Sequence, residues 1–258
     1  MAELHPTAIV DATAELAEDV KVGPYSIIGA RVRIGRGSVI GPHVVVGPNT
    51  TLGARNRVFQ FASIGEAPQD RKYAGEPTTA VIGDDNLFRE YVSIHSGTPY
   101  DRGETTIGNQ NLFLAYSHVA HDCIVGNHTT WSNNAQIAGH VVIDDWVVLG
   151  AFCGIHQYCR VGAHAMLGAF SVVLQDVPPF LIVQGYPAQP KGINGEGLKR
   201  RNFSSDDILA VRRAYKTLYR KGLTLDDATA ALKRAAEDSP VVAPFVDFLA
   251  SSRRGILR

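Results

Sequence analysis

An apolar residue recurs at every sixth position over most of the stretch from Leu4 to Val173, and this period constrains the fold more than any other feature. The series covers residues 4–64 and 82–94, slips by one residue, and continues over 107–173. All 26 of its positions are apolar in a chain that is 45% apolar overall, so chance does not explain it. Hexapeptide repeats of this kind build a parallel β-helix, with one hexad for each short side and three hexads for each coil. The sequence therefore predicts a mainly β fold.

Glycine follows the apolar residue in 13 of these 26 hexads. Gly adopts a positive φ at no steric cost, whereas residues with a Cβ rarely do so. The recurrence therefore predicts a turn with positive φ directly after each apolar residue.

The coil period predicts which residues lie next to one another on the surface. Three hexads make 18 residues, so residues 18 apart are expected to stack at about 4.8 Å, the spacing of paired strands. Gly139 is then expected above His121, and Gln157 above Gly139, while Gln136 stacks on His118. Four of the nine histidines fall in one strip, which favours a functional cleft over unrelated surface histidines. The strip contains His118, His121, His140, His156 and Gln157.

Net charge is zero, which predicts no bulk attraction to nucleic acid or to a membrane. The charge is unevenly spread, because residues 1–190 carry 11 Lys and Arg against 17 Asp and Glu, whereas residues 191–258 carry 14 against 8. The basic end is a candidate surface for an acidic partner. Three scattered cysteines give no disulfide framework, and no transmembrane segment or leader is expected, so a cytoplasmic location is predicted.

Two polar excursions interrupt the repeat. The first, near residues 65–81, keeps the phase but places Asp70 and Glu76 where apolar residues belong. The second, TPYDRGETT at 98–106, supplies the slip of one residue. Long polar loops on rigid scaffolds often carry function, although a tolerated surface excursion is the alternative.

The repeat is expected to end at VPPF (177–180), because consecutive prolines cannot continue a central strand. Helical patterns follow, with capping signals at Ser204 and Asp207 and again at Thr224 and Asp227. We therefore predict a β-helix over residues 1–190 and a small helical domain over 191–258 that closes one end of the coils. Leu4 already belongs to the repeat, so no further N-terminal domain is expected.

Six motifs can be compared with known families: EAPQDRKYAGEPT (66–78), HVAHDC (118–123), AGH (138–140), IHQYC (155–159), VPPF and GEGLKRRNFS (195–204). They resemble those of the UDP-N-acetylglucosamine O-acyltransferases of lipid A biosynthesis, and the similarity extends over essentially the whole chain. The resemblance implies a left-handed parallel β-helix with a small C-terminal α-helical domain, and a homotrimer with active sites between subunits. It also implies transfer of a 3-hydroxyacyl chain from acyl carrier protein to the glucosamine 3-OH of UDP-N-acetylglucosamine, the first step of lipid A biosynthesis.

The resemblance also implies roles for individual residues. His121 matches the general base, which acts without a covalent intermediate, and the Gly139 N–H matches the donor to the oxyanion. Asp122 is a candidate to orient the imidazole, although adjacent strand residues point to opposite faces. No metal or organic cofactor is implied, and the acidic carrier protein is expected to meet the basic C-terminal region. The implied sugar contacts are Asp70, Lys72, His118 and His140, and the implied uridine diphosphate contacts are His156, Gln157, Asn194, Glu196, Arg200 and Arg201.

The chain departs from the family pattern at two places. Ser96 stands where the family usually has Arg in IHRGT, so a charge contact from that position is absent. Ala169, with Met166 nearby, occupies the position that limits the acyl slot, where Gly leaves the slot long and a bulky residue shortens it. Ala predicts a medium donor such as 3-hydroxydodecanoyl. The acceptor is either the 3-hydroxy sugar or its 3-amino analogue.

Three other protein classes compete with this interpretation. A zinc-dependent carbonic anhydrase on the same fold would explain several histidines, but not GLKRR or the Asp70 loop. The related N-acyltransferase carries an additional N-terminal uridine-binding domain, whereas here the repeats begin at residue 4. A noncatalytic scaffold would not need clustered histidines.

Overall fold

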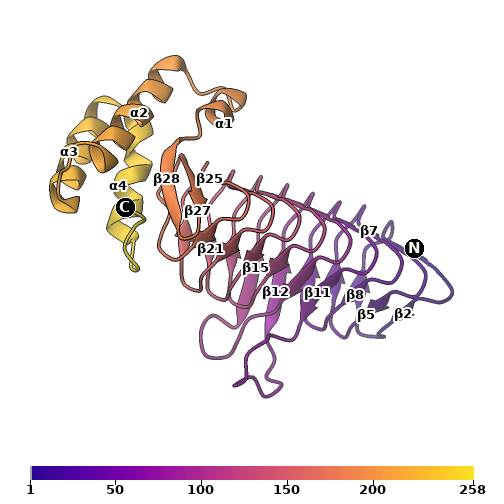
Figure 1. Cartoon of the computed structure of the whole chain (residues 1–258). Coiled ribbons are helices and arrows are strands. Elements are labelled where there is room, and N and C mark those ends of the chain that lie inside the picture. Colours follow the sequence, from indigo (N-terminus) through magenta and orange to yellow (C-terminus); the bar gives the residue numbers. More distant parts are fainter. Residues whose placement is uncertain (1) are drawn as a thin grey trace.

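The protein is described here by a computed structural model, which covers residues 2–258. Short strands wind into coils whose three parallel sheets form the sides of a prism, and helices lie at the end opposite the N-terminus (Figure 1). The fold is a left-handed parallel β-helix with a small C-terminal helical region, which confirms the predicted fold class.

Each sheet takes one parallel strand from each coil, and the first sheet ends with an antiparallel pair, Leu181–Gly185 with Ala188–Ile193. The first sheet consists of β1 (Glu3–Leu4), β4 (Lys21–Val22), β7 (Val39–Ile40), β10 (Arg57–Val58), β13 (Leu87–Phe88), β16 (Leu112–Phe113), β19 (Thr130–Trp131), β22 (Val148–Leu149), β25 (Met166–Leu167), β27 (Leu181–Gly185) and β28 (Ala188–Ile193). The second sheet consists of β2 (Ile9–Val10), β5 (Ile27–Ile28), β8 (Val45–Val46), β11 (Ser63–Glu66), β14 (Ser93–His95), β17 (His118–Val119), β20 (Gln136–Ile137), β23 (Gly154–Ile155) and β26 (Val172–Val173). The third sheet consists of β3 (Glu15–Leu16), β6 (Arg33–Ile34), β9 (Thr50–Leu52), β12 (Thr79–Ile82), β15 (Glu104–Ile107), β18 (Ile124–Val125), β21 (Val142–Ile143) and β24 (Arg160–Val161).

Three sets of turns join these sheets, and we call them the first, second and third corners. The first corner leads from the first sheet to the second, the second corner from the second sheet to the third, and the third corner from the third sheet back to the first. Strand partners such as Leu4 and Val22 are separated by one coil of three hexads, as the period predicts. The repeat residues point inward, where the rings of Phe88, Phe113 and Trp131 stack with centroids 4.9 Å apart. This continuous core holds the corners in fixed register.

The explanation of the repeat glycines by positive φ is wrong. Among the glycines that follow a repeat residue, Gly65 has a positive φ (77°), whereas Gly23 and Gly35 do not. A Cβ on Gly23 would lie 2.8 Å from the carbonyl carbon of Gly41, and one on Gly35 would lie 2.6 Å from backbone of the next coil. Glycine is needed there because neighbouring coils approach closely. The positive φ falls two residues later, on residues such as Tyr25, Arg31, His43, Asn49 and Asp122.

Both polar excursions leave from the second corner. Ile64 pairs with Ile94, more than one coil period further along the chain, because the first excursion is inserted between β11 and β12. Ile94 in turn pairs with Val119, again beyond one coil period, because the second excursion is inserted between β14 and β15. Thr79 N donates to Gly103 O at 2.9 Å, so the two excursions lie side by side.

The C-terminal region contains α1 (Gly195–Arg200), α2 (Ser205–Tyr219), α3 (Leu225–Asp238), η1 (Pro240–Val242) and α4 (Ala243–Ser251). Ser204 and Asp207 form the predicted capping box of α2, and Thr224 caps α3. Phe245 packs on Phe180 of the β-helix, with ring centroids 5.5 Å apart. β28 passes through residue 190, and the proposed division of the chain at that point stays a prediction.

Candidate functional site

Four predicted residues, His118, His121, Gly139 and Gln157, line one hollow at the second corner. His118 opens β17, His121 lies in the turn that follows, and His140 lies in the same turn one coil further on. His140 N donates to His121 O at 3.0 Å, which fixes the two turns against each other. The hollow has a volume of about 430 Å³, and we call it the histidine hollow. It is lined by Gln69, His118, Ala120, His121, Gln136, Ile137, Ala138, Gly139, Gly154, Ile155 and Gln157.

His121 and Asp122 form a direct pair, with Nδ1 of the imidazole 2.9 Å from Oδ2 of the carboxylate. Strand alternation would separate these side chains, but the φ of 59° at Asp122 turns the carboxylate back toward the ring. The Asp122 side chain is fully buried and accepts hydrogen bonds from the Thr98 N–H at 2.9 Å and the Thr98 hydroxyl at 2.7 Å. When Nδ1–H donates to Asp122, Nε2 of His121 is the free acceptor.

Because Gly139 has no side chain, the His121 ring can occupy the space next to it. A Cβ at this position would lie 2.5 Å from Cε1 and 2.7 Å from Nε2 of His121, closer than any side chain could be accommodated without movement. Among residues 2–258 the Gly139 N–H has no hydrogen-bond partner. A backbone donor is thus available next to the imidazole.

His118 is held in its neutral form. Burial, assisted by the neighbouring His95, lowers its pKa to about 4, and Ser93 Oγ lies 2.8 Å from Nδ1. The ring of His95 meets it edge-on with centroids 4.8 Å apart, and burial also lowers the pKa of His95. His95 was not among the predicted residues, because the second excursion separates its strand from β17 in the hexad count. Aligning Ile94 with Val119 across that excursion places it next to the histidine strip.

His140 lies between two groups that were not predicted. Its Nδ1 is 2.6 Å from Oδ2 of Asp101, and its ring stacks on Tyr158 with centroids 4.3 Å apart. It also meets His121 edge-on at 5.0 Å. Asp101 belongs to the second excursion, so that loop reaches the site directly.

The first excursion borders the hollow through Gln69. The neighbouring Asp70 accepts a hydrogen bond from Lys72 N at 2.8 Å, within the loop. Lys72 is exposed, and its carbonyl accepts a hydrogen bond from Tyr100 of the second excursion. Both residues therefore belong to the loop beside the hollow, although neither lines it.

Of the predicted nucleotide contacts, Gln157 lines the hollow and the exposed His156 precedes it. The other four lie elsewhere in the chain. Asn194 caps α1 and donates to His164 O at 2.9 Å, while Glu196 pairs with Lys199 at 2.8 Å. The structure does not bring these two residues to His121 within one chain.

Arg201, at the end of α1, packs against the third corner. Its guanidinium contacts His164 Nδ1 at 3.2 Å and lies over the Trp146 ring, 5.1 Å from the centroid. Burial and the Arg201 charge lower the pKa of His164 to about 4, so the imidazole is neutral and can accept this bond. Arg200 is exposed beside it.

The predicted acyl-length residues stand away from the histidine hollow. Met166 opens β25 on the first sheet, and Ala169 is exposed in the first corner. One chain therefore places the base, the basic segment and the acyl-length residues at different edges of the prism.

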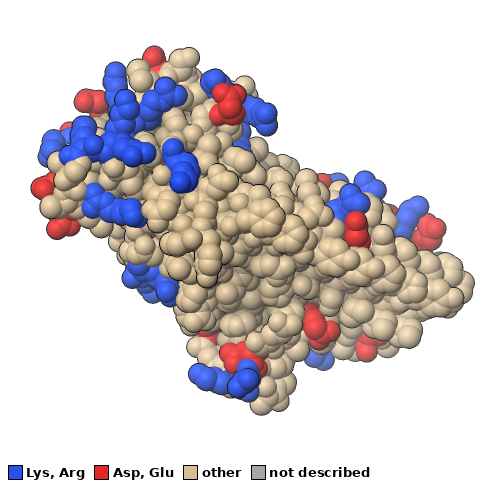
Figure 2. Space-filling view, viewed as in Figure 1, with Lys and Arg blue, Asp and Glu red and all other residues tan. Residues whose placement is uncertain are grey.

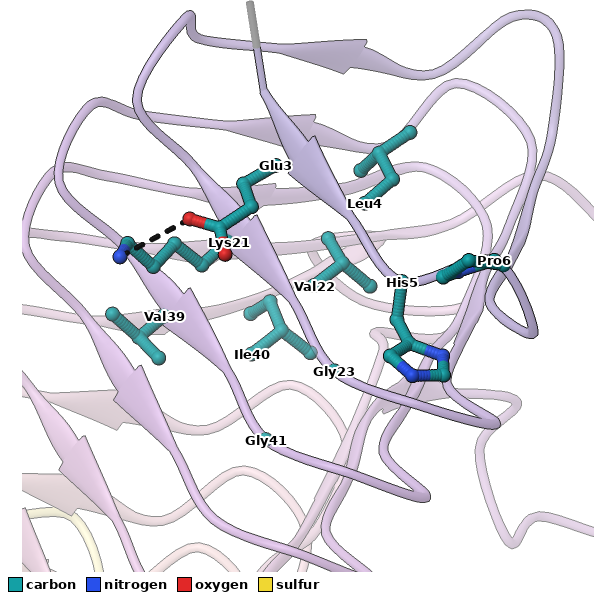
Figure 3. A pocket seen from close by; sticks show the side chains of 10 residues that line it. All are labelled: Glu3, Leu4, His5, Pro6, Lys21, Val22, Gly23, Val39, Ile40 and Gly41. Carbon is teal, nitrogen blue, oxygen red and sulfur yellow. Dashed lines mark ion pairs between the residues drawn. The ribbon is translucent and has the colours of Figure 1, made fainter.

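A second hollow of about 430 Å³ lies at the N-terminal end of the first sheet (Figure 3). Its lining includes Leu4, Val22 and Ile40, with an ion pair between Glu3 and Lys21 at 3.1 Å. His5 is the imidazole there, and its Nδ1 bonds to Thr7. This hollow lacks the paired acid and base groups of the second corner, so we place the candidate site at the histidine hollow.

One group of donors could hold a metal ion. Ligand atoms of His121, Asp122 and His140 lie within 4.8 Å of one another. His121 and Asp122 are already joined by a hydrogen bond, His140 bonds to Asp101, and both Asp122 oxygens accept from protein donors. The geometry is that of a hydrogen-bonded acid and base cluster.

Comparison with known proteins points to one family. Residues 13–48 match the bacterial transferase hexapeptide repeat, and residues 176–257 match the second domain of UDP-N-acetylglucosamine O-acyltransferase. The acyl-carrier-protein UDP-N-acetylglucosamine O-acyltransferase of Thiobacillus denitrificans is 55% identical over 258 residues, which cover 100% of both chains. That of Pseudomonas aeruginosa is 52% identical over 258 residues, again with 100% of both chains covered.

Solved structures agree with the sequence relatives. The UDP-N-acetylglucosamine acyltransferase of Francisella novicida superposes with a TM-score of 0.97 at 43% identity, over 99% of this chain and 94% of that one. The enzyme of Moraxella catarrhalis gives 0.96 at 43% identity, over 99% of both chains. Within residues 2–258 no helix is both long and apolar enough to cross a membrane. The chain belongs to the UDP-N-acetylglucosamine O-acyltransferase family.

Proposed function

We propose that this chain transfers a 3-hydroxyacyl group from acyl carrier protein to the glucosamine 3-OH of UDP-N-acetylglucosamine, the first step of lipid A biosynthesis. The family relationship supports the substrates, and one observation supports the chemistry. His121 is paired with a buried carboxylate and faces a free backbone N–H, which is the arrangement that acyl transfer to a hydroxyl requires. Mass spectrometry of the product tests the proposal. A panel of acyl carrier proteins offered with the 3-hydroxy and 3-amino acceptors would identify both substrates.

In this mechanism Nε2 of His121 removes the proton of the sugar hydroxyl as its oxygen attacks the thioester carbonyl carbon. The Gly139 N–H donates to the oxyanion of the tetrahedral intermediate. As the C–S bond breaks, the proton passes from His121 to the departing thiolate of the carrier protein. The imidazole returns to its neutral state, and Asp122 holds its orientation throughout.

No covalent acyl-enzyme is needed. All three cysteines are buried, and burial raises the pKa of Cys123 to about 12 and that of Cys159 to about 11. Burial raises the pKa of Cys153 as well. Thiols with such pKa values are not reactive thiolates at neutral pH, which supports direct transfer between the two substrates.

We infer that His118, which is neutral, and His140 bind sugar hydroxyls, and that Asp70 and Lys72 approach the sugar from the first excursion. The carrier protein is acidic and would dock on the helical end, where lysines and arginines gather (Figure 2). Opposite charges across such a contact speed association and orient the partner.

A homotrimer would complete the site. The base and the Arg201 segment stand at different corners of one prism, so a neighbouring copy can bring them together. A column of stacked aromatic rings supports this, because exposed apolar surface of this extent commonly marks an interface. The column follows the first corner through Tyr25, His43, Phe61, Tyr91 and Tyr116.

Replacing Arg200 or Arg201 with Ala is expected to weaken binding of the UDP-sugar. Each guanidinium would lose charge-assisted bonds to phosphate, worth about 1.5 to 3 kcal/mol, or roughly ten-fold to a hundred-fold in affinity. Calorimetry on each variant measures this, with Arg212→Ala on the exposed face of α2 as control. Unchanged affinity in both single variants would remove the nucleotide role from this segment.

The acyl-length role of Ala169 predicts a shift in donor preference. Ala169→Gly is expected to accept longer 3-hydroxyacyl donors, and Ala169→Met to prefer shorter ones. One methylene is worth about 0.8 kcal/mol, so a two-carbon step changes preference by roughly ten-fold. Competition assays with mixed donors compare the three proteins. Identical donor profiles would show that this position does not face the acyl slot.

A further inference from the structure

The second excursion contains a short segment, 98–101, that bonds to Asp122, to His140 and to the first excursion. Ser96 and Gly97 separate it from β14, and it contributes three polar side chains within four residues. Thr98 ends the segment that corresponds to IHRGT in the family, whereas Tyr100 and Asp101 lie outside the motifs that carry the resemblance.

Thr98 is hydrogen-bonded to the Asp122 carboxylate, which pairs with the base His121. Its side chain is buried, and it contacts both oxygens of Asp122 through its N–H at 2.9 Å and its hydroxyl at 2.7 Å. From the other side of the excursion, the Thr105 hydroxyl accepts a hydrogen bond from Asp122 N at 2.8 Å. The loop thereby fixes the position of Asp122, and through it that of His121.

Asp101 fixes the second histidine. Its Oδ2 lies 2.6 Å from Nδ1 of His140, whose side chain is 13% exposed, while the Asp101 side chain is 43% exposed. A carboxylate next to Nδ1 favours a proton on that nitrogen. Nε2 of His140 is then an acceptor for a substrate hydroxyl.

Tyr100 joins the segment to the first excursion. Its hydroxyl donates to the carbonyl of Lys72 at 2.6 Å, across 28 residues of sequence. Through this bond the loop with Asp70 and Lys72 is tied to the same short segment that supports both histidines.

We propose that segment 98–101 is a positioning clasp, which sets His121, His140 and the first excursion in one geometry for the sugar of the acceptor. Thr98, Tyr100 and Asp101 are positioning residues and need not touch the substrate. The inference rests on the proposed function, because it assigns the clasp to the UDP-sugar and not to the acyl donor. The clasp would contribute to substrate specificity from a segment that lies outside the hexapeptide repeat.

The test compares Asp101→Ala with Glu104→Gln. Both carboxylates belong to the same excursion, but Glu104 contacts Arg102 at 3.7 Å and the Thr79 hydroxyl at 3.2 Å, and it contacts no histidine. Asp101→Ala is expected to raise KM for the UDP-sugar by roughly ten-fold to a hundred-fold, the usual worth of a charge-assisted bond. KM for the acyl carrier protein should stay within about two-fold of the original value. Equal acceptor KM values in the two variants would overturn the proposal.

A second readout does not depend on activity. Nitrogen NMR of the His140 imidazole in the full-length protein should show the Nδ1-protonated tautomer in the parent and in Glu104→Gln, and lose that preference in Asp101→Ala. An unchanged tautomer in Asp101→Ala would overturn the clasp. If the parent protein acylated no UDP-sugar, the proposed function would fail instead, while the tautomer would still report on the Asp101 contact.

Discussion

Replacing His121 with Ala is expected to lower kcat by about 10²-fold to 10⁴-fold, the usual contribution of a positioned general base. The loss has a specific cause, because Nε2 of His121 is the free imidazole nitrogen once Nδ1 pairs with Asp122. Steady-state assays with acyl carrier protein and UDP-sugar measure the change. Substrate binding should change much less than kcat.

The fold is expected to tolerate this substitution. Asp122 keeps its two hydrogen bonds from Thr98, so no buried carboxylate is left without partners. Circular dichroism and the oligomeric state should match those of the parent, and His5→Ala at the far end of the prism serves as control. Asp122→Asn should cost less than His121→Ala, because it removes the orienting charge and keeps the base. A His121→Ala variant with more than about half the parent activity would contradict the assignment.

The fold could be predicted because one physical rule repeats along the chain. Each coil must point its apolar residues inward and must complete three hexads, so the contact between His121 and Gly139 follows from counting alone. The same counting placed Gln157 at the hollow. Register in a β-helix is set by its core, and the core is visible in the sequence.

Contacts that depend on turn dihedral angles or on the excursions could not be predicted in this way. Alternation along a strand argued against the contact between Asp122 and His121, but a positive φ at Asp122 redirects its side chain. Asp101 reaches His140 across 39 residues, and no fixed period relates them because the excursion interrupts the count. Loop geometry depends on local turns and side-chain bonds, which the hexad pattern does not encode.

The position of Arg201 shows a second reason why part of the site could not be predicted from the sequence. The sequence associates it with the site only through the resemblance to the family, whereas in one chain it lies at the third corner against Trp146 and His164. A site that is completed by a neighbouring copy cannot be assembled from the register of a single chain. In the proposed homotrimer, symmetry would supply the missing relation.

Replacing Gly139 with Ala is expected to lower kcat by roughly 10²-fold to 10³-fold, the usual cost of losing an oxyanion donor. The added Cβ would lie 2.5 Å from Cε1 and 2.7 Å from Nε2 of His121, so the imidazole must move away from its place beside Asp122. A methyl group at this position would also obstruct the approach of the thioester carbonyl to the N–H. Pre-steady-state assays of acyl transfer would measure the chemical step directly.

Gly154 offers a matched control on the same hollow. It lies on β23 and lines the hollow, yet a Cβ there would meet no atom within 4 Å. Gly154→Ala is therefore expected to keep most of the activity, and the difference between the two variants isolates the contact with His121 from any general effect of filling the hollow. Equal losses in Gly139→Ala and Gly154→Ala would mean that crowding lowers the rate, and the oxyanion role would pass to another donor. A large loss confined to Gly139→Ala, with unchanged affinity for the UDP-sugar, would show that the backbone at residue 139 acts in the chemical step, since an interaction made only in the transition state changes kcat and leaves ground-state binding alone.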